Sequence, residues 1–130
     1  MPIRSKIEKN IIKQLKDAGY VVLHSFKLKR KIYDIYISDL NMLIEFNGDY
    51  WHCNPIKYKS NYFNVKLNMT AEQIWKRDAD KKLLAIENGY DFLTIWESDY
   101  RKNKTIILKK IIQKNGRKRI RHIRDGHAKR

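Results

Sequence analysis

The stretch from Tyr33 to His52, YDIYISDLNMLIEFNGDYWH, constrains the fold of this chain more than any other. It contains two apolar runs rich in Ile, Tyr and Phe, which are separated by the short segment SDLN at 38–41. Two such runs around a polar turn predict a β-hairpin. If Ser38 faces Asn41 across a two-residue loop, Asp34 lies directly opposite Glu45.

Alternation of side chains along the two strands then separates an apolar face from a charged one. Asp34 and Glu45 would lie side by side on the charged face. Directly opposed side chains have Cβ atoms roughly 4.5–5.5 Å apart, and like charges at that spacing are destabilising. The hairpin therefore predicts a cation between the carboxylates, and Mg²⁺ prefers such oxygen ligands. A slip of one residue would abolish this arrangement. The apolar face would consist of Ile35, Ile37, Met42 and Ile44.

The same residues carry a resemblance to a known family. Asp34 followed by Glu45-Phe46-Asn47 resembles the PD-(D/E)xK nuclease motif, with Asn47 where that motif usually has lysine. Between about Glu8 and Tyr100 the chain resembles the very-short-patch-repair endonucleases and the phage homing endonucleases that share their catalytic domain. The resemblance implies an α/β fold with a restriction-endonuclease-like core, a mixed central β-sheet flanked by helices. The longer pattern adds Gly48, Trp51-His52, Arg77-Asp78, Gly89-Tyr90 and Ile95-Trp96-Glu97.

This resemblance implies a metal-dependent DNA endonuclease of a phage or mobile element, a phosphodiester hydrolase of the homing type. Mg²⁺, for which Mn²⁺ can substitute, would be held by Asp34, Glu45 and the backbone carbonyl of Phe46. His52 would act as general base, a role that histidine can fill near neutral pH. Asn47 cannot supply the positive charge of the usual lysine, and Lys81 or Lys82 is an alternative source. The expected catalytic residues are Asp34, Glu45, His52, Asn47, Glu8 and Asp78.

Two of these acidic residues have ordinary structural explanations that stay open. Ser5 and Glu8 form a capping-box pattern at the start of a helix that ends at Gly19. Asp78 has Lys82 four residues later, a spacing typical of a helical ion pair worth ~0.2–0.5 kcal/mol.

The rest of the chain alternates between predicted helices and strands. Strands are expected at 20–26 and 90–96, with a long loop at 54–69 between the hairpin and the next helix. Thr70 and Gln73 predict a capping box for that helix. Its end is predicted at Asn88-Gly89, and its apolar stripe comprises Trp75, Ala79, Leu83 and Ile86. A basic amphipathic helix at 104–114 would turn Ile107, Leu108 and Ile111 inward.

The resemblance implies a nuclease domain at 1–116, which leaves a basic C-terminal tail at 117–130. The formal net charge is +15 overall, of which residues 101–130 carry +12. This asymmetry predicts a polyanionic partner. Double-stranded DNA fits better than a membrane, because no lipidation motif or apolar anchor accompanies the charge. The tail alternatively is a disordered end, or leads into a further DNA-binding domain. Expected DNA contacts are Tyr50, Trp51, Lys29, Arg30, Lys31, Lys57, Lys59, Arg117, Lys118, Arg119 and Arg121.

The single cysteine, Cys53, excludes a disulfide framework within the chain and a four-cysteine zinc site. The repair endonucleases carry a structural zinc, so the chain departs from them here and we expect no structural zinc. A cytoplasmic protein is expected, in the host cell if the protein is phage-encoded, as a monomer or a homodimer. Two rival functions stay open. One is a catalytically inactive nucleic-acid-binding module with a nuclease-like fold, and the other is a structural protein whose basic tail meets acidic partners.

Overall fold

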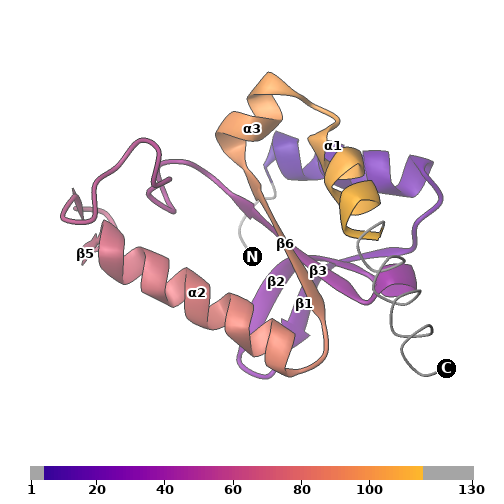
Figure 1. Cartoon of the computed structure of the whole chain (residues 1–130), viewed down its shortest axis with the longest axis horizontal. Helices are drawn as coiled ribbons and strands as arrows, with labels where there is room; N and C mark the ends of the chain where they lie inside the picture. Colours follow the sequence, from indigo (N-terminus) through magenta and orange to yellow (C-terminus); the bar gives the residue numbers. More distant parts are fainter. Residues whose placement is uncertain (1–4, 116–130) are drawn as a thin grey trace, which may run out of the picture.

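The computed structural model describes residues 5–115 and shows an α/β fold. A four-stranded mixed sheet has the order β1-β2-β3-β6, with helices packed against it (Figure 1). Within the described part of the chain, no helix is long and apolar enough to cross a membrane. The strands are β1 (Val22–Leu28), β2 (Lys31–Ile37), β3 (Met42–Asn47) and β6 (Asp91–Trp96), and the helices are α1 (Lys6–Asp17), α2 (Ala71–Glu87) and α3 (Glu97–Lys102).

The predicted central hairpin is confirmed in its register. β2 pairs with β3 in antiparallel fashion through Ile35↔Ile44, Tyr36↔Leu43 and Ile37↔Met42. The turn between them is a single 3-10 turn at Ser38–Leu40. Asn41 closes the turn with a φ of 48°, a left-handed conformation that asparagine tolerates better than most residues. The polar turn residues therefore determine the register locally.

One face of the sheet is covered by α1 and by a second helical segment at 106–115. Ser5 begins α1, with its Oγ accepting a hydrogen bond from the backbone N–H of Glu8 at 3.1 Å. Gly19 follows the helix with a φ of 94°, as predicted. The shared core on this face includes Ile11, Leu15, Ile35, Ile37, Met42, Ile44, Ile95, Ile107 and Ile111.

The opposite face is covered by α2, whose N-terminal capping box at Thr70 and Gln73 is confirmed. The predicted apolar stripe of this helix is wrong, because Leu83 and Ile86 are 52% and 49% exposed. The buried residues are Ala71, Ile74 and Ala85 instead. The side of the helix turned toward the sheet also carries charged residues that line a cavity, so counting apolar residues gives the wrong rotation of the helix.

β6 lies parallel to β3, with Glu45 opposite Thr94, and α2 belongs to the crossover that joins the two strands. The carboxyl ends of β3 and β6 therefore meet at one edge of the sheet. The predicted loop at 54–69 is wrong in one respect, since it contains a small two-stranded ladder of β4 (Phe63–Asn64) and β5 (Met69–Thr70). That segment packs on its own small cluster around Cys53, Ala71 and Ile74.

Candidate active site

Asp34 and Glu45 lie where the regular pairing of β2 and β3 stops. Backbone pairing runs as far as Ile35↔Ile44. Beyond that point, the two carboxylates accept hydrogen bonds from backbone N–H groups. The backbone N–H of Asp34 donates to Oε1 of Glu45 at 2.9 Å. The backbone N–H of Phe46 donates to Oδ2 of Asp34 at 2.8 Å. Each carboxylate is thus fixed by the opposite strand, and the two acidic groups are neighbours as the sequence predicted.

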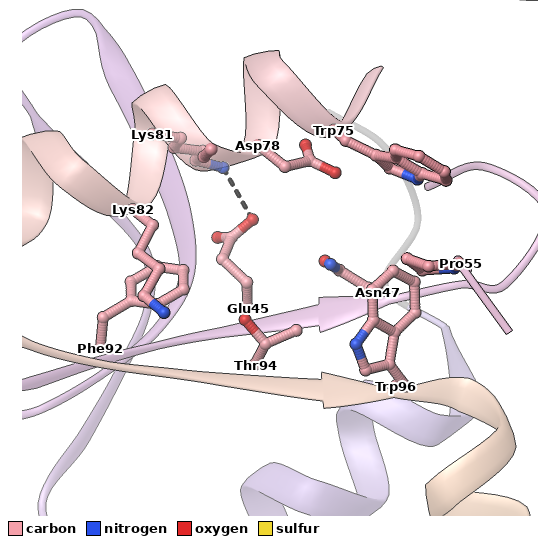
Figure 2. Close-up of a pocket in the computed structure, with 11 residues that line it drawn as sticks. Glu45, Asn47, Pro55, Trp75, Asp78, Lys81, Lys82, Phe92, Thr94 and Trp96 are labelled. Atoms are coloured by element: carbon pink, nitrogen blue, oxygen red, sulfur yellow. Dashed lines mark hydrogen bonds and ion pairs between the residues drawn. The ribbon is translucent and has the colours of Figure 1, made fainter. Parts of the chain in front are cut away.

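Glu45 is almost fully buried and is paired with a lysine from α2. Its side chain is about 91% shielded, and Nζ of Lys81 lies 2.8 Å from its Oε2 (Figure 2). Burial raises the pKa of Glu45, and repulsion from Asp34 adds to the increase. The Lys81 ammonium acts in the opposite direction but does not cancel it. A buried carboxylate of this kind is stabilised by any cation that approaches the pair.

The position of Lys81 is itself fixed by the sheet. The hydroxyl of Tyr33 donates to the backbone carbonyl of Lys81 at 2.6 Å. The ammonium of the same lysine lies 4.9 Å from the centroid of the Tyr33 ring. Of the two lysines that the sequence offered in place of the one missing at Asn47, Lys81 is therefore the one that contacts Glu45. Lys82 lines the same cavity.

A cavity of about 370 Å³ opens beside this pair, between α2 and the carboxyl ends of β3 and β6. Figure 2 shows Trp75, Asp78 and Lys81 on α2, on the opposite side of the cavity from Glu45 and Asn47. Asn47 is buried and lines the cavity. The lining comprises Glu45, Asn47, Pro55, Trp75, Asp78, Ala79, Lys81, Lys82, Phe92, Thr94 and Trp96.

His52 and Asp78 form a second pair, of which Asp78 lines this cavity. Nδ1 of His52 lies 2.8 Å from Oδ2 of Asp78, and both side chains are largely buried. An ionised carboxylate only accepts hydrogen bonds, so Nδ1 carries the proton and a neutral ring has its lone pair on Nε2. Oδ1 of Asp78 lies 3.5 Å from Nη2 of Arg77. The partners found for Asp78 are thus His52 and Arg77, and the predicted ion pair with Lys82 is wrong.

The segment between β3 and the small ladder is held by Asp49, a residue that the sequence did not single out. Oδ2 of Asp49 accepts from Nζ of Lys57 at 2.9 Å. Oδ1 accepts from Nδ2 of Asn54 at 2.9 Å and from the backbone N–H of Ser98 at 3.4 Å. Burial favours a higher pKa for Asp49, but these hydrogen bonds together outweigh it, so the pKa lies below its usual range. We call Asp49, Asn54, Lys57 and Ser98 the Asp49 clasp.

Glu8 does not join the carboxylate pair in a three-residue metal site. Among residues 5–115, no group of three or more His, Cys, Asp and Glu side chains is placed to hold a metal ion. The backbone N–H of Glu8 donates to Oγ of Ser5, which makes Ser5 the N-cap of α1. This bond does not involve the Glu8 carboxylate, so both explanations of that carboxylate stay predictions. For Phe46, the contact with the pair is made by the backbone N–H. The carbonyl of Phe46 as a ligand stays a prediction.

The residues expected to contact DNA occupy several places. Tyr50 and Trp51 lie on the loop after β3, where their rings meet edge to face at 5.1 Å. The Trp51 side chain is about half exposed, and the ammonium of Lys66 lies 5.8 Å from its ring. Lys57 is engaged by Asp49 in the clasp. Lys29 and Arg30 form the exposed turn between β1 and β2, and Lys31 begins β2 and is exposed too. Lys59 is exposed on the later loop. Arg117, Lys118, Arg119 and Arg121 lie outside the described residues.

Comparison of the chain with protein-family models and with curated proteins finds no match in either set.

Proposed function

We propose that this chain is a metal-dependent DNA endonuclease with a restriction-endonuclease-like core, of the phage or mobile-element homing type. The observation that carries the proposal is the Asp34–Glu45 pair, whose Glu45 binds Lys81 and lines a cavity where β3 and β6 end. A PD-(D/E)xK site needs two carboxylates and an ammonium group at one phosphate. These three residues supply that set, with the lysine coming from a helix instead of from the motif itself.

Asp34 and Glu45 also fit a hard divalent cation. They are two neighbouring carboxylates, and Mg²⁺ is commonly bound through one or two carboxylates together with water. Each oxygen of the Glu45 carboxylate accepts one hydrogen bond and has two lone pairs, so it retains a lone pair for a metal. When bound there, Mg²⁺ or Mn²⁺ would polarise a phosphate oxygen and lower the pKa of a coordinated water.

The remaining groups of the site have roles that follow from their contacts. Nε2 of His52 accepts a proton from the attacking water, while Asp78 holds the ring in the required tautomer. The ammonium of Lys81 offsets the charge of Glu45 and the charge that develops on the phosphate. Asn47 offers an amide donor in the cavity and no charge. Tyr50, Trp51 and the lysines around them contact the DNA.

The test is incubation of the protein with supercoiled plasmid, with and without Mg²⁺. Conversion of the plasmid to nicked or linear DNA is expected only with metal, and Asp34→Ala should lose it while DNA binding persists. Asp80→Ala is the matched control, because Asp80 is an exposed acidic residue on α2 whose partner is Lys76. An Asp34→Ala protein that cuts at more than about a tenth of the wild-type rate contradicts the proposal.

One observation favours the alternative of a catalytically inactive nucleic-acid-binding module. Lys81 already provides a cation for Glu45, and both carboxylates accept hydrogen bonds from the backbone. The pair can therefore be satisfied within the protein. If this alternative holds, the wild-type protein binds DNA but leaves the plasmid intact in both Mg²⁺ and Mn²⁺.

A further inference from the structure

A second hollow, of about 380 Å³, lies outside the candidate active site, between the first turns of α1 and the C-terminal end of α3. Figure 1 shows the two helices next to each other. Basic side chains reach this hollow from three segments of the chain, and none of the side chains that line it is acidic. Its lining comprises Lys6, Ile7, Asn10, Tyr100, Arg101 and Lys104, which we call the α1/α3 groove.

The two walls of the groove are joined to each other by Gln14. Its Nε2 donates to the backbone carbonyl of Lys104 at 2.7 Å and to Oδ1 of Asn10 at 2.5 Å. Because Oδ1 of Asn10 faces Gln14, Nδ2 of Asn10 is directed away from Gln14. The position of Asn10 relative to Lys104 is thus set by the fold.

Arg101 is held as well, but only in part. Its Nη2 donates to Oε2 of Glu97 at 2.8 Å, one turn earlier on α3. A guanidinium has five N–H donors, so this contact leaves it able to bind another anion. Beneath it, Tyr100 is buried in the core together with Ile107 and α1. The groove therefore combines two lysines with an anchored arginine on a rigid base.

The groove and the candidate active site are connected through one short element. Trp96 lines the cavity beside Glu45, and α3 begins at the following residue. Arg101 is five residues later, roughly 7.5 Å further along a helix. A polymer whose reacting phosphate lies in the cavity can thus follow α3 into the groove.

We propose that the α1/α3 groove binds a backbone phosphate of the DNA at a distance from the bond that is cleaved. The proposal rests on the function proposed above and adds a contact that sets the position of the strand in the site. Phosphate oxygens accept strong hydrogen bonds from lysine and arginine. Contacts of this kind fix the position of a protein on DNA without reading its sequence. Inorganic phosphate has the same chemistry, so the test must separate it from DNA.

The experiment compares the double variant Lys6→Gln/Lys104→Gln with Lys9→Gln/Lys16→Gln, all in the full chain. The control variant removes the same charge from exposed positions on α1 that do not line the groove. Binding to one short duplex is measured by fluorescence anisotropy in EDTA, over a range of salt concentrations. Each phosphate contact contributes about −0.9 to the slope of log K against log salt. Loss of two lysines from the groove should reduce the magnitude of this slope by roughly 1–2, and the control should change it by less than about 0.5.

The outcomes separate this proposal from the proposed function. Equal slopes for the groove variant and the control, with the wild type binding DNA, overturn the groove alone. Absence of DNA binding by the wild type overturns both. Plasmid cleavage by the groove variant at saturating DNA should keep the wild-type rate, with a raised KM. Millimolar inorganic phosphate is also added to both proteins at constant ionic strength. If it displaces the duplex equally from the wild type and from the groove variant, the proposed phosphate site in the groove is contradicted, because a general anion effect needs no specific site.

Discussion

Nζ of Lys81 lies 2.8 Å from Oε2 of Glu45, across 36 residues of sequence. Glu45 belongs to β3 and Lys81 to α2, so the contact spans the interface between the sheet and one of its covering helices. It brings an ammonium group to the Asp34–Glu45 pair, which has an asparagine, Asn47, two residues after Glu45. This contact makes Lys81 the residue whose replacement tests the site most directly.

Replacement of Lys81 should impair cleavage more than binding. Lys81→Met removes the ammonium, and a loss of one electrostatic stabiliser of the transition state typically costs ~10²–10³ in kcat. Lys82→Met is the matched control, since Lys82 is the adjacent residue and lines the same cavity. Single-turnover cleavage at saturating DNA measures the effect. A rate for Lys81→Met equal to that of the wild type would show that Lys81 has no catalytic role.

Divalent cations should stabilise the fold through the Asp34–Glu45 pair. A ligand that binds only the native state adds ~2.7 kcal/mol at 100 times its Kd. Thermal melts should shift upward with Mg²⁺ or Mn²⁺, and Asp34→Asn or Glu45→Gln should reduce that shift. Asp80→Asn is the control. A melting temperature that stays constant across millimolar metal contradicts the metal site.

The raised pKa of Glu45 predicts how stability depends on pH. The ordinary pKa is 4.5, and burial followed by repulsion from Asp34 raises it in the folded chain. The folded chain thus holds this proton more firmly than the unfolded chain does. The resulting stability is complete below pH 4.5 and is lost as the pH rises through the folded pKa.

Urea denaturation at a series of pH values from 4.5 toward neutrality measures this loss. Glu45→Gln cannot ionise, so its free energy of unfolding should fall less with rising pH than that of the wild type. Parallel pH dependences for the two proteins would mean that Glu45 titrates normally.

The His52–Asp78 pair predicts a loss of rate with little loss of affinity. Asp78→Asn keeps the size of the side chain but removes the carboxylate that fixes the proton on Nδ1 of His52. General-base catalysis contributes typically 10²–10⁴-fold, so kcat should fall within that range. KM for plasmid should change little. Asp80→Asn is the control on the same helix, and an unchanged kcat in Asp78→Asn would exclude His52 as a base positioned by Asp78.

The Asp49 clasp predicts a structural effect. Asp49→Ala leaves buried donors of Asn54 and Ser98 without their acceptor, at a cost of about 1–3 kcal/mol. The pKa of Asp49 is lowered below its ordinary 3.8, so its contribution is present above that pH and is lost as the pH falls through the folded pKa. Chemical denaturation near neutral pH measures the difference from wild type. Stability equal to that of the wild type would show that the clasp is dispensable.

Sequence reasoning was most successful where structure is decided locally. The SDLN turn established the register of β2 and β3, and with it the neighbouring positions of Asp34 and Glu45. The helix ends at Ser5, Thr70, Gly19 and Gly89 were predictable for the same reason. Caps and turns depend on a few adjacent residues, whose side chains and backbone angles act over one turn.

The sequence by itself thus determined α1, α2, the strands of the central sheet, the hairpin and its two carboxylates, because these depend on short-range periodicity and turn chemistry. It did not predict β4, β5 or α3. Tertiary structure decided which side of α2 faces the sheet, through the Tyr33 hydroxyl and the Lys81 carbonyl. It also selected Lys81 over Lys82 and paired Asp78 with His52. Successive side chains are roughly 100° apart around the axis of a helix. No local pattern fixes which of them face the sheet when the buried side of the helix is partly charged.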